Sequence, residues 1–412
     1  MKIPDSMYDL AYRFKKAKLW EKLWDTELFA VRHADGEIGY CCIMGRLGEH
    51  TAIAVYTGDE GMYSFQRISE HVPVTNDREN LERSTSQNCV SLSFGGKEDM
   101  LPETLEEVRD YNKRCVIVAR GAKAFPVFEK FEPRHLMWKI TRQEDAARIR
   151  DALEAALEVA EKLKTHTPEQ LGFTDGEPFD RKIPLLEKAE KGYTWSDIML
   201  PPRFAVRYPE SGAYDDITLA KIRKAKQNRR DWALHICLEP EPLYGENEDE
   251  AGDTAPFFSF LLIVIDEHMQ EILSAEISPD SERYPQDFRS ALAKTIIGKG
   301  RPKAIHCIND RTQAFLREIA RQTGISVLRQ ARNAFIERWL EDEDEMYRKG
   351  MEGEEAFDEE LLEGLWDAIR SPEVRGSMPD MLVRDMYAQI GKGLLPADIE
   401  EIIRAEKKAR NL

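Results

Sequence analysis

Four acidic residues hold positions from which a carboxylate could bind a divalent metal ion: Glu239, Asp266, Asp310 and Glu337. Carboxylate oxygens are the hard ligands that magnesium prefers. The local sequence also gives three of them ordinary structural roles. Asp266 suits the start of a hairpin turn, Asp310 suits the N-cap of a helix, and Glu337 begins the acidic face of another helix. These residues alone leave catalysis and structure as open alternatives.

The elements that position these carboxylates lie between residues 232 and 339. A continuous apolar run at 257–265 predicts a strand buried on both faces, and residues 232–239 predict another strand before it. Helix-spaced apolar residues followed by glycines predict helices between the later strands. The predicted order is strand 232–239, strand 257–265, strand 271–277, helix 288–297, strand 303–308, helix 311–322, strand 325–328 and a helix from about 333.

Three antiparallel strands followed by alternating helices and strands form the layout of the ribonuclease H-like fold. The sequence also resembles the retroviral-type integrase core within that fold. Four segments carry this resemblance: FLLIVID at 260–266, ILSAEI at 272–277, GRPKAIHCINDRTQAF at 300–315 and RNAFIERW at 332–339. We therefore expect a mixed sheet in which residues 232–239 lie beside the FLLIVID segment.

That family uses two or three carboxylates to hold metal ions that align an attacking oxygen with a phosphodiester. By position, the resemblance makes Asp310 the second aspartate and Glu337 the catalytic glutamate. The first aspartate is expected three residues after the tryptophan of the first strand, where His235 stands. Magnesium prefers oxygen to imidazole, so Glu239 on the same strand face, or Asp266, would have to replace it. We expect the fold without its catalysis, and magnesium only under the catalytic alternative.

Other catalytic signatures are missing from the sequence. Gly95-Gly96-Lys97 lacks the upstream glycine and the following Ser or Thr of a phosphate-binding loop. No GxSxG, HExxH or GxGxxG motif is present. His135 and His306 have no partner that the sequence identifies, so we expect structural roles for both. No cofactor is predicted.

The predicted fold class is α+β, with an α+β domain in the first 165 residues. An Asp-Gly turn at 34–37 indicates a hairpin there, and a long amphipathic helix ends near residue 164. The other strands of this domain are expected at 51–56, 88–94 and 114–119. The expected divisions of the chain are the N-terminal domain 1–165, a connector with some helix at 166–230, the ribonuclease H-like domain 231–332 and an all-helical tail 333–412.

A second resemblance spans most of the chain. It rests on LWDTELFAVRHADGEIGYCCIMGRLGEHTAIAVYTGDEGM at 23–62 and FPVFEKFEPRHLMW at 125–138. These segments resemble a bacterial domain family of unknown function, which a second uncharacterised domain similar to 257–330 commonly follows. The resemblance implies an uncharacterised two-domain protein, and it brings no reaction or cofactor.

Composition and charge narrow the choice of partners. The formal net charge is −17, which disfavours nucleic acid. The basic stretch 221–230 lacks aromatic residues for stacking on bases, so we interpret it as a solvated helix face. No apolar run reaches the roughly 20 residues of a membrane helix, and no signal peptide is recognisable. Six scattered cysteines are typical of reduced thiols in a cytoplasm.

These observations favour a cytoplasmic, non-catalytic binding or adaptor protein. Its acidic loop at 239–253 and its helical tail would contact an unknown protein partner. The alternative is a metal-dependent nuclease or phosphodiesterase that uses Asp310, Glu337 and either Glu239 or Asp266.

Overall fold

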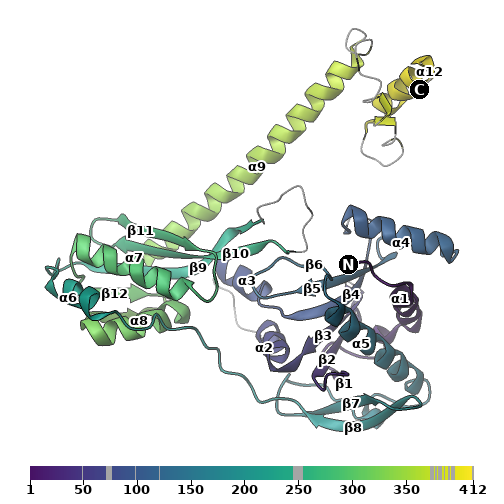
Figure 1. The fold of residues 1–412 in the computed structure, drawn as a ribbon, viewed down its shortest axis with the longest axis horizontal. Coiled ribbons are helices and arrows are strands. Elements are labelled where there is room, and N and C mark those ends of the chain that lie inside the picture. Colours follow the sequence, from purple (N-terminus) through teal and green to yellow (C-terminus); the bar gives the residue numbers. More distant parts are fainter. Residues whose placement is uncertain are drawn as a thin grey trace. The chain divides into compact units, whose positions relative to one another are not determined.

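The computed structural model divides into two compact units, residues 1–336 and 337–412. It describes residues 1–410 except 49, 71–76, 98, 120, 245–253, 372–374, 376–377, 379–382, 385, 388–389 and 391–394. The side chains of 348 and 350–365 also lie outside the description. The first unit holds two β-sheets (Figure 1). The α+β class that the sequence predicts is confirmed.

The first sheet has eight strands in the order β6-β5-β4-β3-β2-β1-β7-β8. Neighbours pair antiparallel except β1 and β7, which are parallel. The expected Asp-Gly hairpin joins β1 to β2, and Gly36 adopts the positive φ of 92° that this turn requires. The strands are β1 Phe29–Arg32, β2 Ile38–Met44, β3 Ala52–Thr57, β4 Cys89–Gly95, β5 Phe125–Phe131, β6 Trp138–Lys139, β7 Lys182–Lys188 and β8 Tyr193–Met199.

Helices cover both faces of this sheet because successive strand side chains point to opposite sides. Val31, Cys41 and Val55 share one core with helices α1, α4 and α5, whereas Tyr40 and Tyr56 belong to a second core with α2. The helices of this part are α1 Asp5–Ala17, α2 Gly58–Ser69, α3 Asp77–Ser84, α4 Pro102–Arg114 and α5 Gln143–Lys162, with short 3-10 turns at Leu19–Glu21 and Glu169–Leu171.

Two expectations for the N-terminal half are wrong. Residues 166–230 are not only a connector with helix, because the β7–β8 hairpin lies within them and joins the sheet beside β1. That parallel pairing joins residues more than 150 positions apart, so no local pattern announces it. The strand expected at 114–119 is also absent: α4 runs to Arg114, and Val116 and Val118 are exposed. The β-branched side chains of these two valines therefore face solvent and do not contribute to a core.

The second sheet has five strands in the order β11-β10-β9-β12-β13. β9, β10 and β11 are antiparallel to one another, and β12 is parallel to both β9 and β13. The predicted order of elements is confirmed, and His235 of β9 lies opposite Ile263 of β10 as expected. These elements are α6 Asp216–Lys224, β9 Asp231–Leu243, β10 Phe257–Asp266, β11 Glu271–Ser278, α7 Tyr284–Lys299, β12 Ala304–Cys307, α8 Asp310–Thr323 and β13 Ser326–Arg329.

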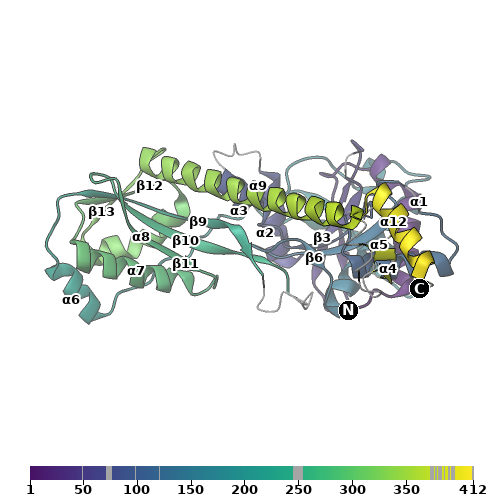
Figure 2. The same cartoon turned by 90° about the horizontal axis from the view of Figure 1, so that it is seen from above.

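Helices α7 and α8 pack on one face of this sheet (Figure 2). Trp232, Leu234 and Ile236 of β9 point into that core, together with apolar residues of both helices. By alternation, His235 and Cys237 point to the opposite face. The position that the integrase resemblance reserves for a metal ligand therefore lies on the face that α7 and α8 do not cover.

The second unit is helical, as the sequence predicts. Helix α9 spans Ala334–Arg370, and its start is capped by Asn333, whose side-chain oxygen accepts from the backbone N–H groups of Phe335 and Ile336. Helix α12 spans Ala397–Arg410. Ile369, Val383, Met386, Ile399 and Ile403 form a small core in this unit. None of the described helices combines the length and the apolar character needed to cross a membrane.

Candidate functional site

His235 occupies the position where the integrase resemblance expects the first metal-binding aspartate. Its side chain is buried, with only 4% of the residue exposed. Asn309, two residues after β12, donates to the carbonyl oxygen of Ile236 (2.9 Å) and lies 3.4 Å from Nδ1 of His235. Burial, and then the charges of three arginines at positions 78, 329 and 311, lower the pKa of His235 to about 3. The imidazole is therefore neutral at physiological pH, within a positive field.

Asp310 is exposed and paired with an arginine. It is the first residue of α8, and its Oδ1 accepts a hydrogen bond from Nε of Arg329 at 3.3 Å. The expected N-cap at Asp310 is wrong by one residue. Asn309 is the cap, because its side-chain oxygen accepts from the backbone N–H of Thr312 at 2.8 Å.

Asp266 has the structural role that its turn sequence predicts. Its Oδ1 accepts from the backbone N–H groups of His268 and Met269, both at 3.0 Å, and its Oδ2 accepts from Arg230 at 3.0 Å. Burial raises the pKa of Asp266, but these hydrogen bonds outweigh burial, so the pKa is lowered overall. In the sheet Asp266 lies opposite Trp232, three residues before His235 along β9.

Glu239 and Glu337 do not complete a metal site. Glu239 lies on β9 beyond Cys237, is half-buried and has interaction partners of its own. Glu337 lies on α9, in the second unit, and is likewise half-buried and engaged. Within the part of the chain that the structure describes, no three His, Cys, Asp or Glu side chains are grouped closely enough to hold a metal ion.

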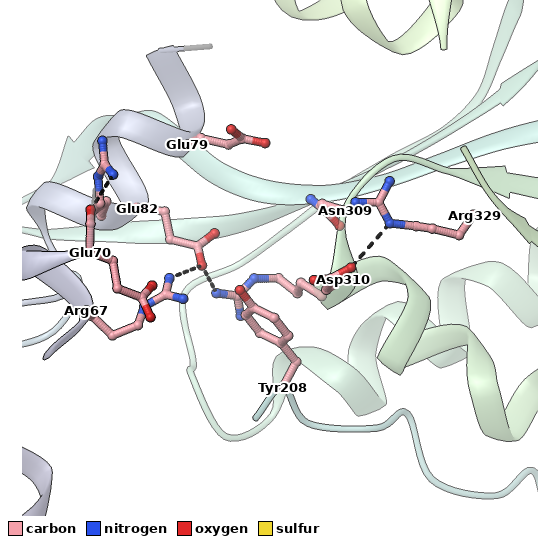
Figure 3. Close-up of a pocket in the computed structure, with 10 residues that line it drawn as sticks. Arg67, Glu70, Glu79, Glu82, Tyr208, Asn309, Asp310 and Arg329 are labelled. Carbon is pink, nitrogen blue, oxygen red and sulfur yellow. Dashed lines mark hydrogen bonds and ion pairs between the residues drawn. The ribbon is translucent and has the colours of Figure 1, made fainter. Parts of the chain in front are cut away.

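A polar crevice of about 240 Å³ opens beside Asn309 and Asp310. Figure 3 shows Glu79 and Glu82 of α3 on one side of it, and Asp310 of α8 and Arg329 of β13 on the other. Four arginines and four carboxylates line this strand-end crevice, so their formal charges cancel. The lining residues are Arg67, Glu70, Glu79, Glu82, Arg83, Tyr208, Asn309, Asp310, Arg311 and Arg329.

Arg311 and Glu82 form the central contact of the strand-end crevice. Nη2 of Arg311 lies 2.7 Å from Oε1 of Glu82, and Nη1 donates to the hydroxyl of Tyr284 at 3.1 Å. The guanidinium also lies over the rings of Tyr208 and Phe260, at 4.8 and 4.7 Å from their centroids. Burial lowers the pKa of Arg311, but Glu82 and Tyr284 more than offset it, so the net shift is upward.

Helix α3 of the N-terminal part packs directly on β9. Arg78 of α3 is only 3% exposed, and its Nη1 donates to the carbonyl oxygen of Leu238 at 2.8 Å. Arg78 also contributes to the positive field at His235. The N-terminal part therefore delivers a buried cation to the place where a metal-dependent enzyme would need a cation-binding carboxylate.

The residues around His235 do not fit magnesium. A neutral imidazole replaces the first carboxylate, Asp310 is paired with Arg329, and two further arginines, Arg78 and Arg311, are buried nearby. The positive charges of these arginines repel a divalent cation at this position. The strand-end crevice is suited to holding two parts of the chain together, and we derive no metal-dependent step from it.

The two histidines that the sequence left without partners both have them. Nδ1 of His306 lies 2.9 Å from both carboxylate oxygens of Glu267, whose Oε1 also accepts from Asn333 at 2.6 Å. Nδ1 of His135 lies 2.9 Å from the carbonyl oxygen of Pro133. The contacts of Glu267 with His306 and Asn333 tie β12, the β10–β11 turn and the start of α9 together, and the contact of His135 is local, so both histidines have structural roles.

The important residues that sequence reasoning missed are Arg78, Glu82 and Arg311. The Arg311–Glu82 pair joins residues 229 positions apart, so neither partner carries a local signal. Arg311 follows Asp310 directly, and the integrase resemblance drew attention to the aspartate alone.

The two sheets of the first unit define an α+β protein in which two domains pack against each other. Residues 5–181 match the domain of unknown function DUF7309, and residues 218–342 match the domain of unknown function DUF6930. The chain carries DUF7309 ahead of DUF6930, and these two matches confirm its resemblance to an uncharacterised two-domain protein. No curated protein and no solved structure matches it. The β7–β8 hairpin lies between the two matched regions.

Proposed function

We propose that the protein is a non-catalytic binding or adaptor protein of the bacterial cytoplasm, built on a ribonuclease H-like scaffold. The strand order supports the scaffold. Three antiparallel strands, β9 to β11, are followed by two parallel strands that alternate with helices, and the first strand, β9, lies at the centre of the sheet. That order and those directions agree with the layout that the sequence predicts for this fold.

The observation that carries the non-catalytic proposal is the environment of His235. The position is buried, neutral and surrounded by Arg78, Arg311 and Arg329. An enzyme of this type needs negative charge there, because the metal ion brings two positive charges. The chain instead uses this face to bind its own helix α3 through Arg78.

The nuclease alternative keeps one supporting observation. Asp310 is exposed and directly follows the loop after β12, beside the strand that carries His235. A metal site would recruit Asp310, Glu337 and either Glu239 or Asp266. Asp266 is engaged by the hairpin turn, and Asp310 is paired with Arg329. The non-catalytic proposal therefore accounts for more of the observed contacts.

The exposed edge of the five-stranded sheet supports a binding role. β11 is the last strand on one side, so no strand of the described residues pairs with its outer row of backbone groups. Ile272 and Ile277 on this strand are 49% and 60% exposed. Proteins usually protect such edges with lysine, proline or a covering segment, and an extended peptide can add to an edge that lacks them. We infer that an extended segment of a protein partner pairs with β11.

The acidic surfaces that the sequence favoured for partner binding stay predictions. Residues 245–253 of the acidic loop, and the side chains at 350–365 of the acidic helix, lie outside the described residues. Magnesium and nucleic acid have no part in the proposed function.

Comparative capture from native cells tests the partner surface. The full chain and its Ile277→Arg variant serve as baits, because a charge at the exposed edge hinders pairing without removing a core side chain. We expect partners retained by the parent chain to fall at least tenfold with Ile277→Arg. The matched control is Leu47→Arg, at an 82% exposed position in a distant loop, which should retain them. Equal capture by all three baits would reject β11 as the binding edge.

A further inference from the structure

A second, larger cavity lies at the β6 side of the eight-stranded sheet. Its volume is about 750 Å³, within the range of roughly 300–1,000 Å³ that is typical of small-molecule sites. Strands β4, β5 and β6, the loop before α4, and α4 itself supply its walls. Phe94, Met100, Val127, Phe128 and Trp138 give it an apolar and aromatic lining. We call it the Glu129 cavity, after the carboxylate on its wall.

Glu129 is an unpaired acid in this apolar setting. It lies in β5, opposite Ser91 of β4 and Lys139 of β6. Among the described residues its carboxylate has no hydrogen-bond or ion-pair partner, because Lys139 is bonded instead to Glu103 at 2.8 Å. Burial, and then the charge of Asp99, raise the pKa of Glu129 to about 7. A half-buried carboxylate without a partner is costly and favours a ligand that supplies one.

Asp99 adds a second acid to the same wall. Its Oδ2 accepts a hydrogen bond from the backbone N–H of Gly96 at 2.7 Å, which fixes its position. Gly95 makes room for it, because a Cβ at this position would lie 2.7 Å from the same oxygen. The two lysines of the lining are committed elsewhere: Lys139 to Glu103, and Lys123 to the carbonyl oxygen of Gly48. Lys139 is neutralised by Glu103, whereas Lys123 keeps its charge, so the two acids Asp99 and Glu129 face one positive charge and the net formal charge left for a ligand is negative.

We propose that the Glu129 cavity binds a small organic amine, whose ammonium group pairs with Glu129 while its apolar body fills the cavity beside Val127, which shares the Glu129 face of the sheet. A largely apolar cavity with one or two acids suits an organic cation, since burial of the apolar body adds to the attraction between the ammonium and the carboxylate. They do not suit a bare divalent metal, which needs several oxygen ligands. Asp99 and Glu129 also repel organic acids. The inference goes beyond the proposed adaptor role and does not depend on it.

The proposed binding is coupled to a proton. In the free protein Glu129 is largely protonated below pH 7 and ionised above it. An ammonium group binds the ionised form, so the affinity should fall about tenfold for each pH unit below 7 and level off above it. The other titratable groups that line the cavity are His50, Asp99, Lys123 and Lys139. His50 is the one histidine among these lining residues, so a His50→Gln variant serves as a control.

Calorimetric titration of the full chain tests this with three probes of similar size: 2-phenylethylamine, 2-phenylethanol and 3-phenylpropanoate. We expect the amine to bind at least tenfold more tightly than the alcohol or the acid. Its affinity should drop at least tenfold in Glu129→Gln, a substitution that keeps the shape of the side chain. Glu106→Gln, on the exposed surface of α4, should bind like the parent chain.

The pH profile supplies a second, independent readout. The tenfold loss per pH unit below 7 should persist in His50→Gln and disappear in Glu129→Gln. Three results would overturn the inference: no binding of the amine, equal or tighter binding of the acid, or unchanged amine affinity in Glu129→Gln. None of these results bears on β11, so failure here is distinguishable from failure of the adaptor proposal.

Discussion

At the scale of single residues, the chemistry of the central domain, which holds the five-stranded sheet, depends on what surrounds His235. Burial and three arginines keep its imidazole neutral, with a pKa of about 3. Asp310 lies close by, yet its carboxylate is paired with Arg329. A carboxylate in the right place in the sequence is therefore not sufficient evidence for a metal site. The cations around it decide whether a metal ion is attracted or repelled.

The contact between Arg311 and Glu82 gives the first prediction. Arg311→Leu should lower the free energy of unfolding by about 2–4 kcal/mol, because it leaves the partly buried Glu82 with only its longer, 4.0 Å contact with Arg67. Urea denaturation measures the loss. The double variant Arg311→Leu with Glu82→Leu should recover part of it, since the buried carboxylate is then gone and only the 4.0 Å contact of Arg67 is lost in its place.

An exposed pair on the same helix is the matched control. Arg317 of α8 lies 2.7 Å from Glu210, the same distance as in the Arg311–Glu82 contact, but both side chains are largely exposed. Arg317→Leu should cost less than about 1 kcal/mol. Equal losses in the two single variants would mean that the strand-end crevice does not hold the two domains together.

At the scale of elements, the start of α8 depends on Asn309. Its side chain caps the helix at the N–H of Thr312 and also donates to the carbonyl oxygen of Ile236, so it joins α8 to β9. Asn309→Ala should reduce the free energy of unfolding by about 1–2 kcal/mol. Asp310→Ala should cost clearly less, because its exposed contact with Arg329 is a surface pair. Chemical denaturation of both variants checks the order, and a larger loss in Asp310→Ala would contradict this assignment of the cap.

Elements with strong local patterns were predictable. The apolar run of β10 and the apolar periodicity of α8, bounded by Gly324, identify their elements without tertiary information. β7 was not predictable, because its short apolar stretch becomes a strand only by pairing with β1. Residues 114–119 show the opposite error, a predicted strand that does not form. Val116 and Val118 are β-branched and so favour a strand, but both face solvent.

At the scale of the whole molecule, the sequence predicted two domains and a helical tail. It did not predict how the domains meet. The contacts of Arg78 with β9, and of Glu82 with Arg311, depend on residues that are brought together only when both domains have folded. The Glu129 cavity is a similar case, because three strands and a loop from separate stretches of sequence form its walls. Sites assembled from distant segments leave no motif.

The claim on which the account depends is that the strand-end face of the central domain binds the chain itself and not a metal ion. Thermal denaturation of the full chain, with and without millimolar Mg²⁺ or Mn²⁺, tests it most directly. A metal ion at a hundred times its dissociation constant would stabilise the fold by about 2.7 kcal/mol. We predict no metal-dependent rise in the melting temperature, and the same result for Asp310→Asn. A rise that Asp310→Asn abolishes would contradict the account and show a metal site at Asp310, as the nuclease alternative requires.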